Sequence, residues 1–399
     1  MSVDRFTLNQ CRNIFQLELP ERSRLYRLPP WGIGTADVES LTSYIARLAT
    51  IHQVPTGVLL RLFVTPILSQ LTDDLKRVSH SFWSSFGSDT GAWNGLGVMA
   101  FNCSQGLSSL TKQDHLHFLT LLTWNQVLSH RGLVRGHKAW CPACYQEWDR
   151  LGVVLHEPLL WSLKLVTVCL RHQQRLQYQC PDCYRPLPSL EWNSRPGYCS
   201  KCLTWLGKIP DSLLEASLAL DKQEQAWQTF VHQNLAQLLA AAPSLPSPVP
   251  RENIARGVNL CINAVTGGNA KAFADLLCYS ASVPGEWRRG NALPQLDLLF
   301  RLCYCLQIPL LEFLTGKVVL DQPVSLIPLP PHQSTRKKYR PFDSALVQSL
   351  LEAALQKDPP KTMRQVALDI GYDPGDLFKY FPDLCRAISQ RYKCRQLKA

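Results

Sequence analysis

The sequence predicts a mainly α-helical protein of several domains, and three observations lead to this prediction. Apolar residues recur at three- to four-residue spacing along much of the 399-residue chain, whereas the strict alternation typical of strands is scarce. Two proline-rich stretches, 243–250 and 323–341, interrupt the helical pattern, because proline fixes φ and lacks an amide donor. The chain is 46% hydrophobic and 18% charged, so it can bury a core.

The first predicted elements are two helices near the N-terminus. Leu41, Ile45 and Leu48 share one face of the first helix, and Pro55 opens the second, which runs through Phe63. Residues 81–105 are rich in Ser, Gly, Asn and aromatic side chains, and we expect an irregular loop there. Residues 210–242 return to a helical period.

The linkers and the clustering of cysteines divide the chain into four predicted domains. A helical domain covers 1–136, and a cysteine-rich module covers 137–207. A second helical domain covers 208–330, and a basic linker with a short C-terminal domain covers 331–399.

The charge of the chain is uneven. The formal net charge is +11, and residues 331–399 hold 13 basic against 7 acidic side chains. Such an excess favours contact with a polyanion, usually nucleic acid. The linker offers four candidate contacts: Arg336, Lys337, Lys338 and Arg340.

The expected environment of the protein is the cytoplasm. No uncharged apolar stretch reaches membrane-spanning length, and residues 1–5 lack the apolar core of a secretory signal. In a reducing compartment, the clustering of the 15 cysteines indicates metal binding better than it indicates disulfides.

The most specific signal is a series of four ligand pairs, each separated by two residues. Such a spacing forms a tight turn that places both ligand atoms on one side, and two such turns complete a tetrahedral zinc site. The four pairs lie within residues 141–202, so buried core cysteines with a chance spacing are an improbable explanation. The ligands are Cys141, Cys144, Cys169, His172, Cys180, Cys183, Cys199 and Cys202.

These ligands predict two structural Zn²⁺ ions in treble-clef or ribbon-like motifs. Each site has four protein ligands and leaves no open position for water. Sequential pairing of the turns is the preferred arrangement, and a cross-braced arrangement stays open. The remaining cysteines, including Cys261, Cys278, Cys303 and Cys305, lie in apolar helical surroundings and are expected in the core.

Residues 362–381 are a helix-turn-helix candidate. Ala367 supplies the small residue where the two helices cross, and Gly371 supplies a residue that takes φ > 0 in the turn. The second helix would begin near Pro374 and present Lys379 and Tyr380 to nucleic acid or to a partner. Asp373 and Asp376 on that helix would repel phosphate, which favours use of the motif to dock a protein.

A second, weaker helix-turn-helix candidate covers 271–300. Ala274 is in place, but Cys278 stands where glycine is expected. Trp287 is expected in the core, with Arg288 and Arg289 available to a phosphate. A plain helical bundle without a nucleic-acid role remains the alternative for both candidates.

The sequence offers no catalytic site. It contains no P-loop, no HExxH and no nucleophile elbow, and its acidic residues are scattered. We therefore expect a protein that is not an enzyme and that has no catalytic residues and no small-molecule substrate.

Three segments together resemble the TniQ/TnsD family of transposon target-selection proteins. Residues 29–49, with Glu39-Ser40-Leu41, resemble the opening of TniQ domains. The segment 141–202 is similar to the family's paired zinc motifs, with Trp161 ahead of the second pair. The tail, 358–392, resembles the C-terminal helix-turn-helix of the same group.

The resemblance implies a role as an adaptor. In this family, the N-terminal domain would contact the AAA+ regulator TnsC, the zinc module would hold the architecture, and the C-terminal part would face the target-recognising partner. In CRISPR-associated transposons that partner is an RNA-guided effector of the Cascade type, at target DNA. In the TnsD branch the protein itself reads a DNA attachment site. Docking is the preferred branch, DNA reading stays open, and an unrelated zinc-containing regulator remains a minor alternative.

Overall fold

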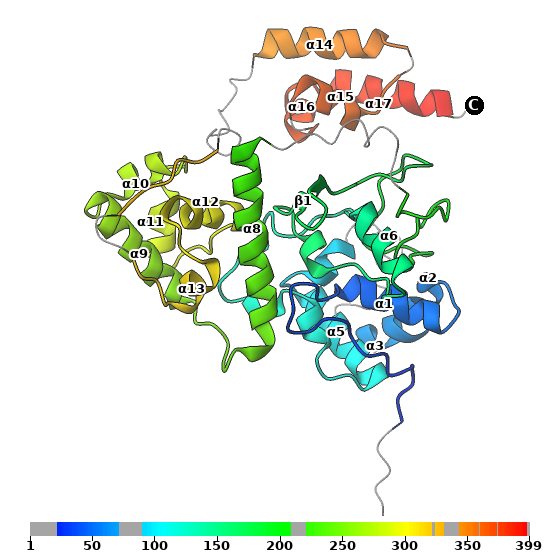
Figure 1. Cartoon of the computed structure of the whole chain (residues 1–399). Helices are drawn as coiled ribbons and strands as arrows, with labels where there is room; N and C mark the ends of the chain where they lie inside the picture. The colour runs from blue at the N-terminus through cyan, green and yellow to red at the C-terminus, as the bar shows by residue number, and fades with distance from the viewer. Residues whose placement is uncertain are drawn as a thin grey trace, which may run out of the picture. The chain divides into compact units, whose positions relative to one another are not determined.

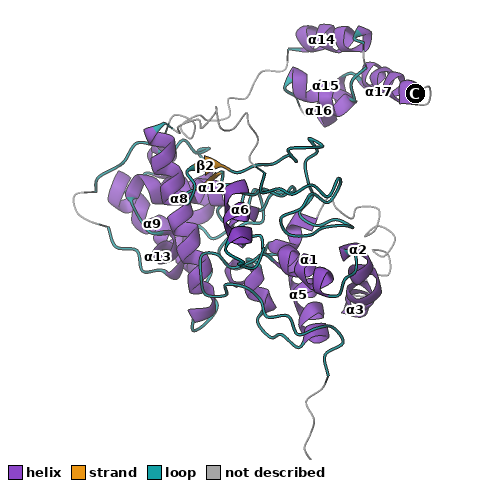
Figure 2. Ribbon diagram, turned by 45° about the vertical axis from the view of Figure 1, so that its right-hand side comes forward, coloured by secondary structure: helices purple, strands orange, loops and turns teal. Residues whose placement is uncertain are grey.

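The computed structural model describes residues 22–71, 90–208, 221–320, 324–330, 343–358, 360–372 and 374–396. Over these residues the protein is mainly helical, with a single two-stranded sheet, which confirms the predicted class (Figure 2). The chain divides into two compact units, Met1–Arg336 and Lys337–Ala399.

The N-terminal part of the first unit is a set of short helices. They are α1 (Leu41–Ile51), α2 (Thr56–Leu59), the π-helix η2 (Leu60–Val64), α3 (Thr65–Leu71), the 3-10 helix η3 (Thr90–Asn94), α5 (Val98–Thr111), and the 3-10 helices η4 (Leu116–Leu119) and η5 (Leu122–Trp124). The Ser40 side chain caps α1 by accepting from the amide of Ser43. The two helices predicted before residue 64 are therefore present.

The irregular loop predicted over 81–105 is wrong for its last part. Residues 98–105 belong to α5, and 81–89 lie outside the described residues. The helix buries the apolar residues Cys103, Leu107 and Leu110 at helical spacing. It also buries Asn102, Ser104 and Gly106, which obscure that period in the sequence. A Cβ added at Gly106 would lie 3.3 Å from Ile67, so small residues here allow close packing on α3.

The cysteine-rich region continues from the N-terminal helices. It contains α6 (Pro142–Arg150), the 3-10 helix η6 (Leu159–Ser162), β1 (Val168–Cys169) and β2 (Gln174–Arg175), which pair antiparallel. The amide of Ser40 donates to the carbonyl of Glu157 over 2.9 Å. The Glu157 carboxylate also forms a buried ion pair with Lys138, at 2.5 Å. The start of α1 and the cysteine-rich region therefore share one polar contact zone.

The rest of the first unit is helical. Its elements are α8 (Lys222–Ala241), the 3-10 helix η7 (Ala242–Ser244), α9 (Glu252–Thr266), α10 (Ala270–Leu276), α11 (Val283–Arg288), α12 (Leu296–Leu306) and α13 (Leu310–Thr315). Helix α8 is the long helix between α9–α13 and the cysteine-rich region in Figure 1. Its Gln228 accepts from the amide of Thr167, and its Asn234 accepts from the amide of Leu310. Helix α8 thus connects the two regions.

One hydrophobic core runs through the first unit, from Leu25 to Leu314. It includes buried cysteines of the cysteine-rich region and Val249 of the proline-rich stretch 243–250. That stretch is packed on the core, with Val249 only 4% exposed.

The second unit has its own core. Its helices are α14 (Ser344–Gln356), α15 (Met363–Ile370), α16 (Pro374–Tyr380) and α17 (Pro382–Gln396). Val347, Leu351, Val366, Leu377 and Cys385 are buried at its centre.

None of the helices in the described ranges is by itself long and apolar enough to cross a membrane. The pair Leu41–Ile51 and Thr56–Leu68, bent by 97°, meets the length and composition requirement only when the two are taken together.

Candidate metal centres

The first cluster combines three cysteines and one histidine. Cys141 is the N-cap of α6, Pro142 begins the helix, and Cys144 lies in its first turn on the same side. Cys169 ends β1, and His172 lies in the turn that leads to β2. The start of α6 and the turn of the β1–β2 hairpin face each other, and the four ligand atoms all lie within 4.8 Å of one another.

The second cluster combines four cysteines on two turns. Cys180 Sγ lies 3.6 Å from Cys202 Sγ, and Cys183 Sγ lies 3.8 Å from Cys199 Sγ. The clusters thus use the first pair with the second and the third with the fourth, which is the sequential arrangement and not the cross-braced one.

The distances in both clusters match a tetrahedral zinc site. With Zn–S of about 2.3 Å and Zn–N of about 2.0 Å, a tetrahedron has S···S edges of about 3.8 Å and S···N edges of about 3.5 Å. In the first cluster, Cys144 Sγ lies 3.6 Å from Cys169 Sγ, and Cys141 Sγ lies 3.5 Å from His172 Nδ1. These separations also exclude S–S bonds, which need about 2.05 Å. The donor set and spacing therefore fit one zinc-type ion in each cluster.

Two further side chains support the ligands of the first cluster. Glu147 of α6 places Oε2 3.3 Å from His172 Nε2, so Nδ1 is left for a metal. Gln174 Nε2 donates to Cys141 Sγ over 2.9 Å. Hydrogen bonds with the Cys144 and Cys169 thiols, reinforced by Gln174, lower the pKa of the Cys141 thiol to about 3. The thiolate is the form that binds a metal.

Glu147 and Gln174 were not among the predicted site residues, although both lie close in sequence to predicted ligands. Glu147 follows Cys144 by three residues, which is one helical turn, and Gln174 follows His172 by two. Neither residue is a zinc ligand type in a ligand spacing, so only the packing of α6 against the β1–β2 hairpin reveals them.

Trp161, which carried part of the family resemblance, lies in an aromatic cluster beside the first metal cluster. It is 6% exposed, contacts Tyr145 edge-on with ring centroids 5.6 Å apart, and stacks on Trp148 at 5.6 Å. Because Tyr145 and Trp148 belong to α6, Trp161 fixes the helix that supplies two of the ligands.

The basic residues predicted to contact nucleic acid or a partner lie apart from the clusters. Arg288 and Arg289 are exposed at the end of α11, where Arg289 pairs with Glu286. Trp287 beside them is 3% exposed and packs edge-on against Tyr279. The linker residues lie outside the described residues: Arg336, Lys337, Lys338 and Arg340.

Both helix-turn-helix candidates have a left-handed residue between their helices. Gly371 takes φ 81 between α15 and α16, and Ala367 is 1% exposed. Lys379 and Tyr380 are exposed on α16, with the Lys379 ammonium 5.4 Å from the Tyr380 ring centroid. In the other candidate, Cys278 takes φ 55 at the position where glycine was expected. This geometry does not by itself assign a DNA-binding role.

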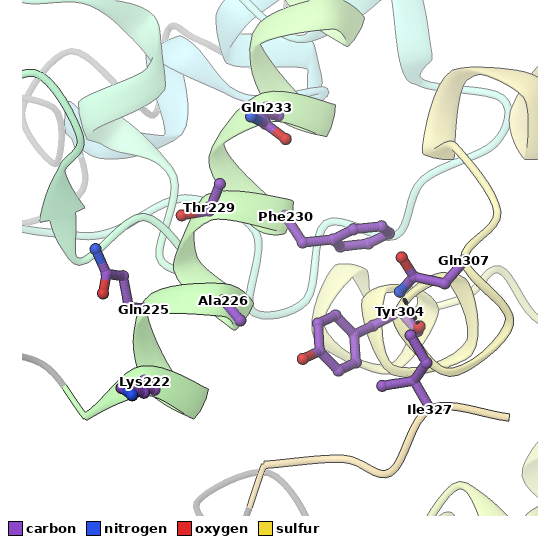
Figure 3. A pocket seen from close by; sticks show the side chains of 9 residues that line it. All are labelled: Lys222, Gln225, Ala226, Thr229, Phe230, Gln233, Tyr304, Gln307 and Ile327. Carbon is purple, nitrogen blue, oxygen red and sulfur yellow. Dashed lines mark hydrogen bonds between the residues drawn. The ribbon is translucent and has the colours of Figure 1, made fainter.

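A cavity of about 530 Å³ lies along α8 (Figure 3). Phe230, Tyr304 and Ile327 form its apolar side, and polar side chains of α8 with Gln307 form the rest. Its lining holds no carboxylate, thiol or imidazole.

Comparison with known families gives a match to one part of the chain. Residues 30–176 match the model of the TniQ family. The match begins ahead of α1 and ends just past β2, so it includes the N-terminal helices and the whole first metal cluster. No curated protein matches the chain significantly. Residues 30–176 are therefore similar to the TniQ domain.

Proposed function

We propose that the protein is a target-selection adaptor of a transposon. It joins a target-recognising complex to the AAA+ regulator TnsC, which in turn recruits the transposase. The observation that carries this proposal is the TniQ match over residues 30–176, because TniQ proteins act in target selection as non-catalytic adaptors. The chain then needs no catalytic residues and no small-molecule substrate.

Two structural Zn²⁺ ions belong to this proposal. The first would be held by Cys141, Cys144, Cys169 and His172, and the second by the four cysteines of 180–202. A bound ion would cross-link turns that are distant in sequence. It would have no open coordination position for a reaction, because four protein ligands complete its coordination sphere. The ligands of the first site connect α6 to the β1–β2 hairpin, so the metal stabilises the part of the TniQ domain that packs on α1.

The two units suggest a division of roles. We assign binding of TnsC to the N-terminal helices and binding of an RNA-guided Cascade-type effector to residues 337–399. The second unit has a core of its own and is joined to the first through the basic linker, which suits an arm that reaches a separate partner. On α16, Asp376 accompanies Lys379, and Asp383 lies in the first turn of α17, so carboxylates lie where phosphate contact would need cations.

A specific observation favours a second candidate function, which is TnsD-like reading of an attachment site. Two helix pairs with a left-handed turn residue, together with exposed Arg288 and Arg289, are compatible with a DNA duplex. In that case the protein would bind its site on the order of 10³-fold more tightly than random DNA, with a steep salt dependence.

Two binding measurements in parallel test the proposal. The full chain is assayed against TnsC and a Cascade-type complex, and it is also used in a selection from randomised duplexes. Binding to both protein partners without an enriched DNA motif supports the adaptor. An enriched motif that is lost in the R288A/R289A variant, without Cascade binding, supports the DNA reader. Absence of TnsC binding contradicts both functions.

A further inference from the structure

The second metal cluster holds two apolar residues in a backbone conformation that disfavours them. Tyr184 follows Cys183 with φ 58, and Leu203 follows Cys202 with φ 64. The left-handed region is free of cost for glycine but not for residues with a Cβ. The amides close the turns, since Tyr184 N donates to Cys180 O and Leu203 N donates to Cys199 O. A glycine would make the same hydrogen bonds without the strain.

The side chains of these two residues are directed into solvent. Tyr184 is 74% exposed and Leu203 is 63% exposed. Five other non-glycine residues with positive φ occur in the described ranges, and all are polar or small: Gln53, Lys112, Gln173, Cys278 and Gln307. The two large apolar examples therefore occur together, at one metal cluster, and neither side chain contributes to the core.

The two turns that carry them are in contact. Thr204 Oγ1, next to Leu203, donates to Asp182 Oδ2 over 3.0 Å, and Cys180 Sγ lies 3.6 Å from Cys202 Sγ. Tyr184 and Leu203 thus project from two adjoining turns that close on the same four sulfur atoms. This pair is called the knuckle tip below.

The chemistry around the knuckle tip favours a protein partner over nucleic acid. The ring of Tyr184 could stack on a base, but Leu203 has neither a ring to stack on a base nor a group to read one. Four thiolates outweigh the charge of one divalent ion, and Asp182 adds a carboxylate, so phosphate would be repelled. Arg185 adds a nearby cation, while the ammonium of Lys201 is already paired with Glu191. A matching surface is an apolar socket with basic side chains at its edge.

We propose that the knuckle tip, Tyr184 and Leu203, is a docking surface that inserts into an apolar, basic-edged socket on a protein partner. The backbone strain and the exposed apolar area are retained because the two side chains act as anchors in that contact. The inference rests on the proposed function, because its partner is taken from the two that the function supplies, TnsC and the Cascade-type complex.

The test compares the full-length Y184G/L203G variant with wild type, both loaded with zinc. Q173G is the matched control, because Gln173 follows His172 with φ 49 at the other cluster but has a polar side chain that donates to Leu170 O. Zinc content, melting temperature, oligomeric state, and affinity for TnsC, for Cascade and for a random duplex are measured for each protein.

We expect Y184G/L203G to bind two zinc ions, to melt no lower than wild type, and to bind one of the two protein probes at least tenfold more weakly. The affinity of Y184G/L203G for the random duplex should equal that of wild type. The affinities of the Q173G control for TnsC and for Cascade should also equal those of wild type. The inference is overturned if affinity for both probes is unchanged, if only duplex affinity falls, or if wild type is a dimer that the variant abolishes. A lower melting temperature would also overturn it, since the side chains would then serve the fold. If wild type binds neither probe, the proposed function fails, and the inference falls with it.

Discussion

The contact between Glu147 and His172 leads to a quantitative prediction about metal affinity. Glu147 Oε2 lies 3.3 Å from His172 Nε2, and it is the group that orients the imidazole with Nδ1 toward the three sulfurs. Removing such a supporting carboxylate weakens metal binding by on the order of 10- to 100-fold. In E147A we expect the lower end of that range, about tenfold or ~1.4 kcal/mol.

Two features of the structure place the effect at the lower end. The side chains of Glu147 and His172 are 28% and 22% exposed, but Glu147 Oε2 itself is buried and forms no hydrogen bond, so its contact with His172 Nε2 is weak. The same carboxylate is also 3.5 Å from Arg171, which competes for it. E147Q, which keeps an oxygen acceptor, should lose less affinity than E147A.

Titration of the zinc-loaded protein with a chelator measures this effect. Wild type should release each ion at a chelator concentration set by its own ligands. E147A should release one ion at about tenfold lower chelator and the other at the wild-type concentration, because Glu147 touches only the first cluster. The reasoning is refuted if both ions shift together, or if neither shifts.

Three further predictions follow from buried groups. C180S should lose one zinc ion and melt at a much lower temperature, since structural zinc contributes on the order of 10 kcal/mol; full zinc content and an unchanged melting curve would contradict the assignment. K138M leaves Glu157 buried without its cation, and it should lower the free energy of unfolding, measured in denaturant titrations, by about 3–5 kcal/mol. The double variant K138M/E157Q should recover part of this loss. Equal stability of K138M and wild type would contradict a stabilising role of the buried ion pair. Burial lowers the pKa of His156 below its ordinary value of 6.5, so the unfolded chain binds the proton more readily; its contribution to stability is present above pH 6.5 and is lost as pH falls below it. H156F, which keeps the stacking on Trp148, should therefore show a smaller loss of melting temperature between pH 7.5 and 5.5 than wild type, and an equal or larger loss would contradict this account.

The metal clusters were predictable because their ligands follow a spacing rule. Pairs separated by two residues bring two ligand atoms to one side of a turn, and Cys141–His172 and Cys180–Cys202 are brought together in the sequential order. Gly371 was predictable for a similar reason, since φ > 0 in a helix-connecting turn favours glycine.

Features that depend on packing between distant segments were not predictable. Helix α5 was missed because Asn102, Ser104 and Gly106 are buried beside its apolar residues and obscure their helical spacing. Glu147 and Gln174 acquire a role only when α6 meets the β1–β2 hairpin. Cys278 takes the left-handed conformation although it is not a glycine. Its residue type alone therefore made this turn a weaker candidate than its backbone conformation does. The proline-rich stretch at 243–250 was expected as a linker, yet Val249 is buried in the core.

The proposed role in target selection is tested most directly by mapping insertion sites in cells that contain the complete transposon system. Insertions are sequenced with the wild-type chain, with its gene deleted, and with the guide RNA of the Cascade-type effector changed. The account predicts that insertions follow the guide to its new target and that deletion abolishes this targeting. Insertions that stay at one fixed site when the guide changes would contradict the adaptor and support the attachment-site reader. Targeting that persists after deletion would contradict any role of this protein in target selection.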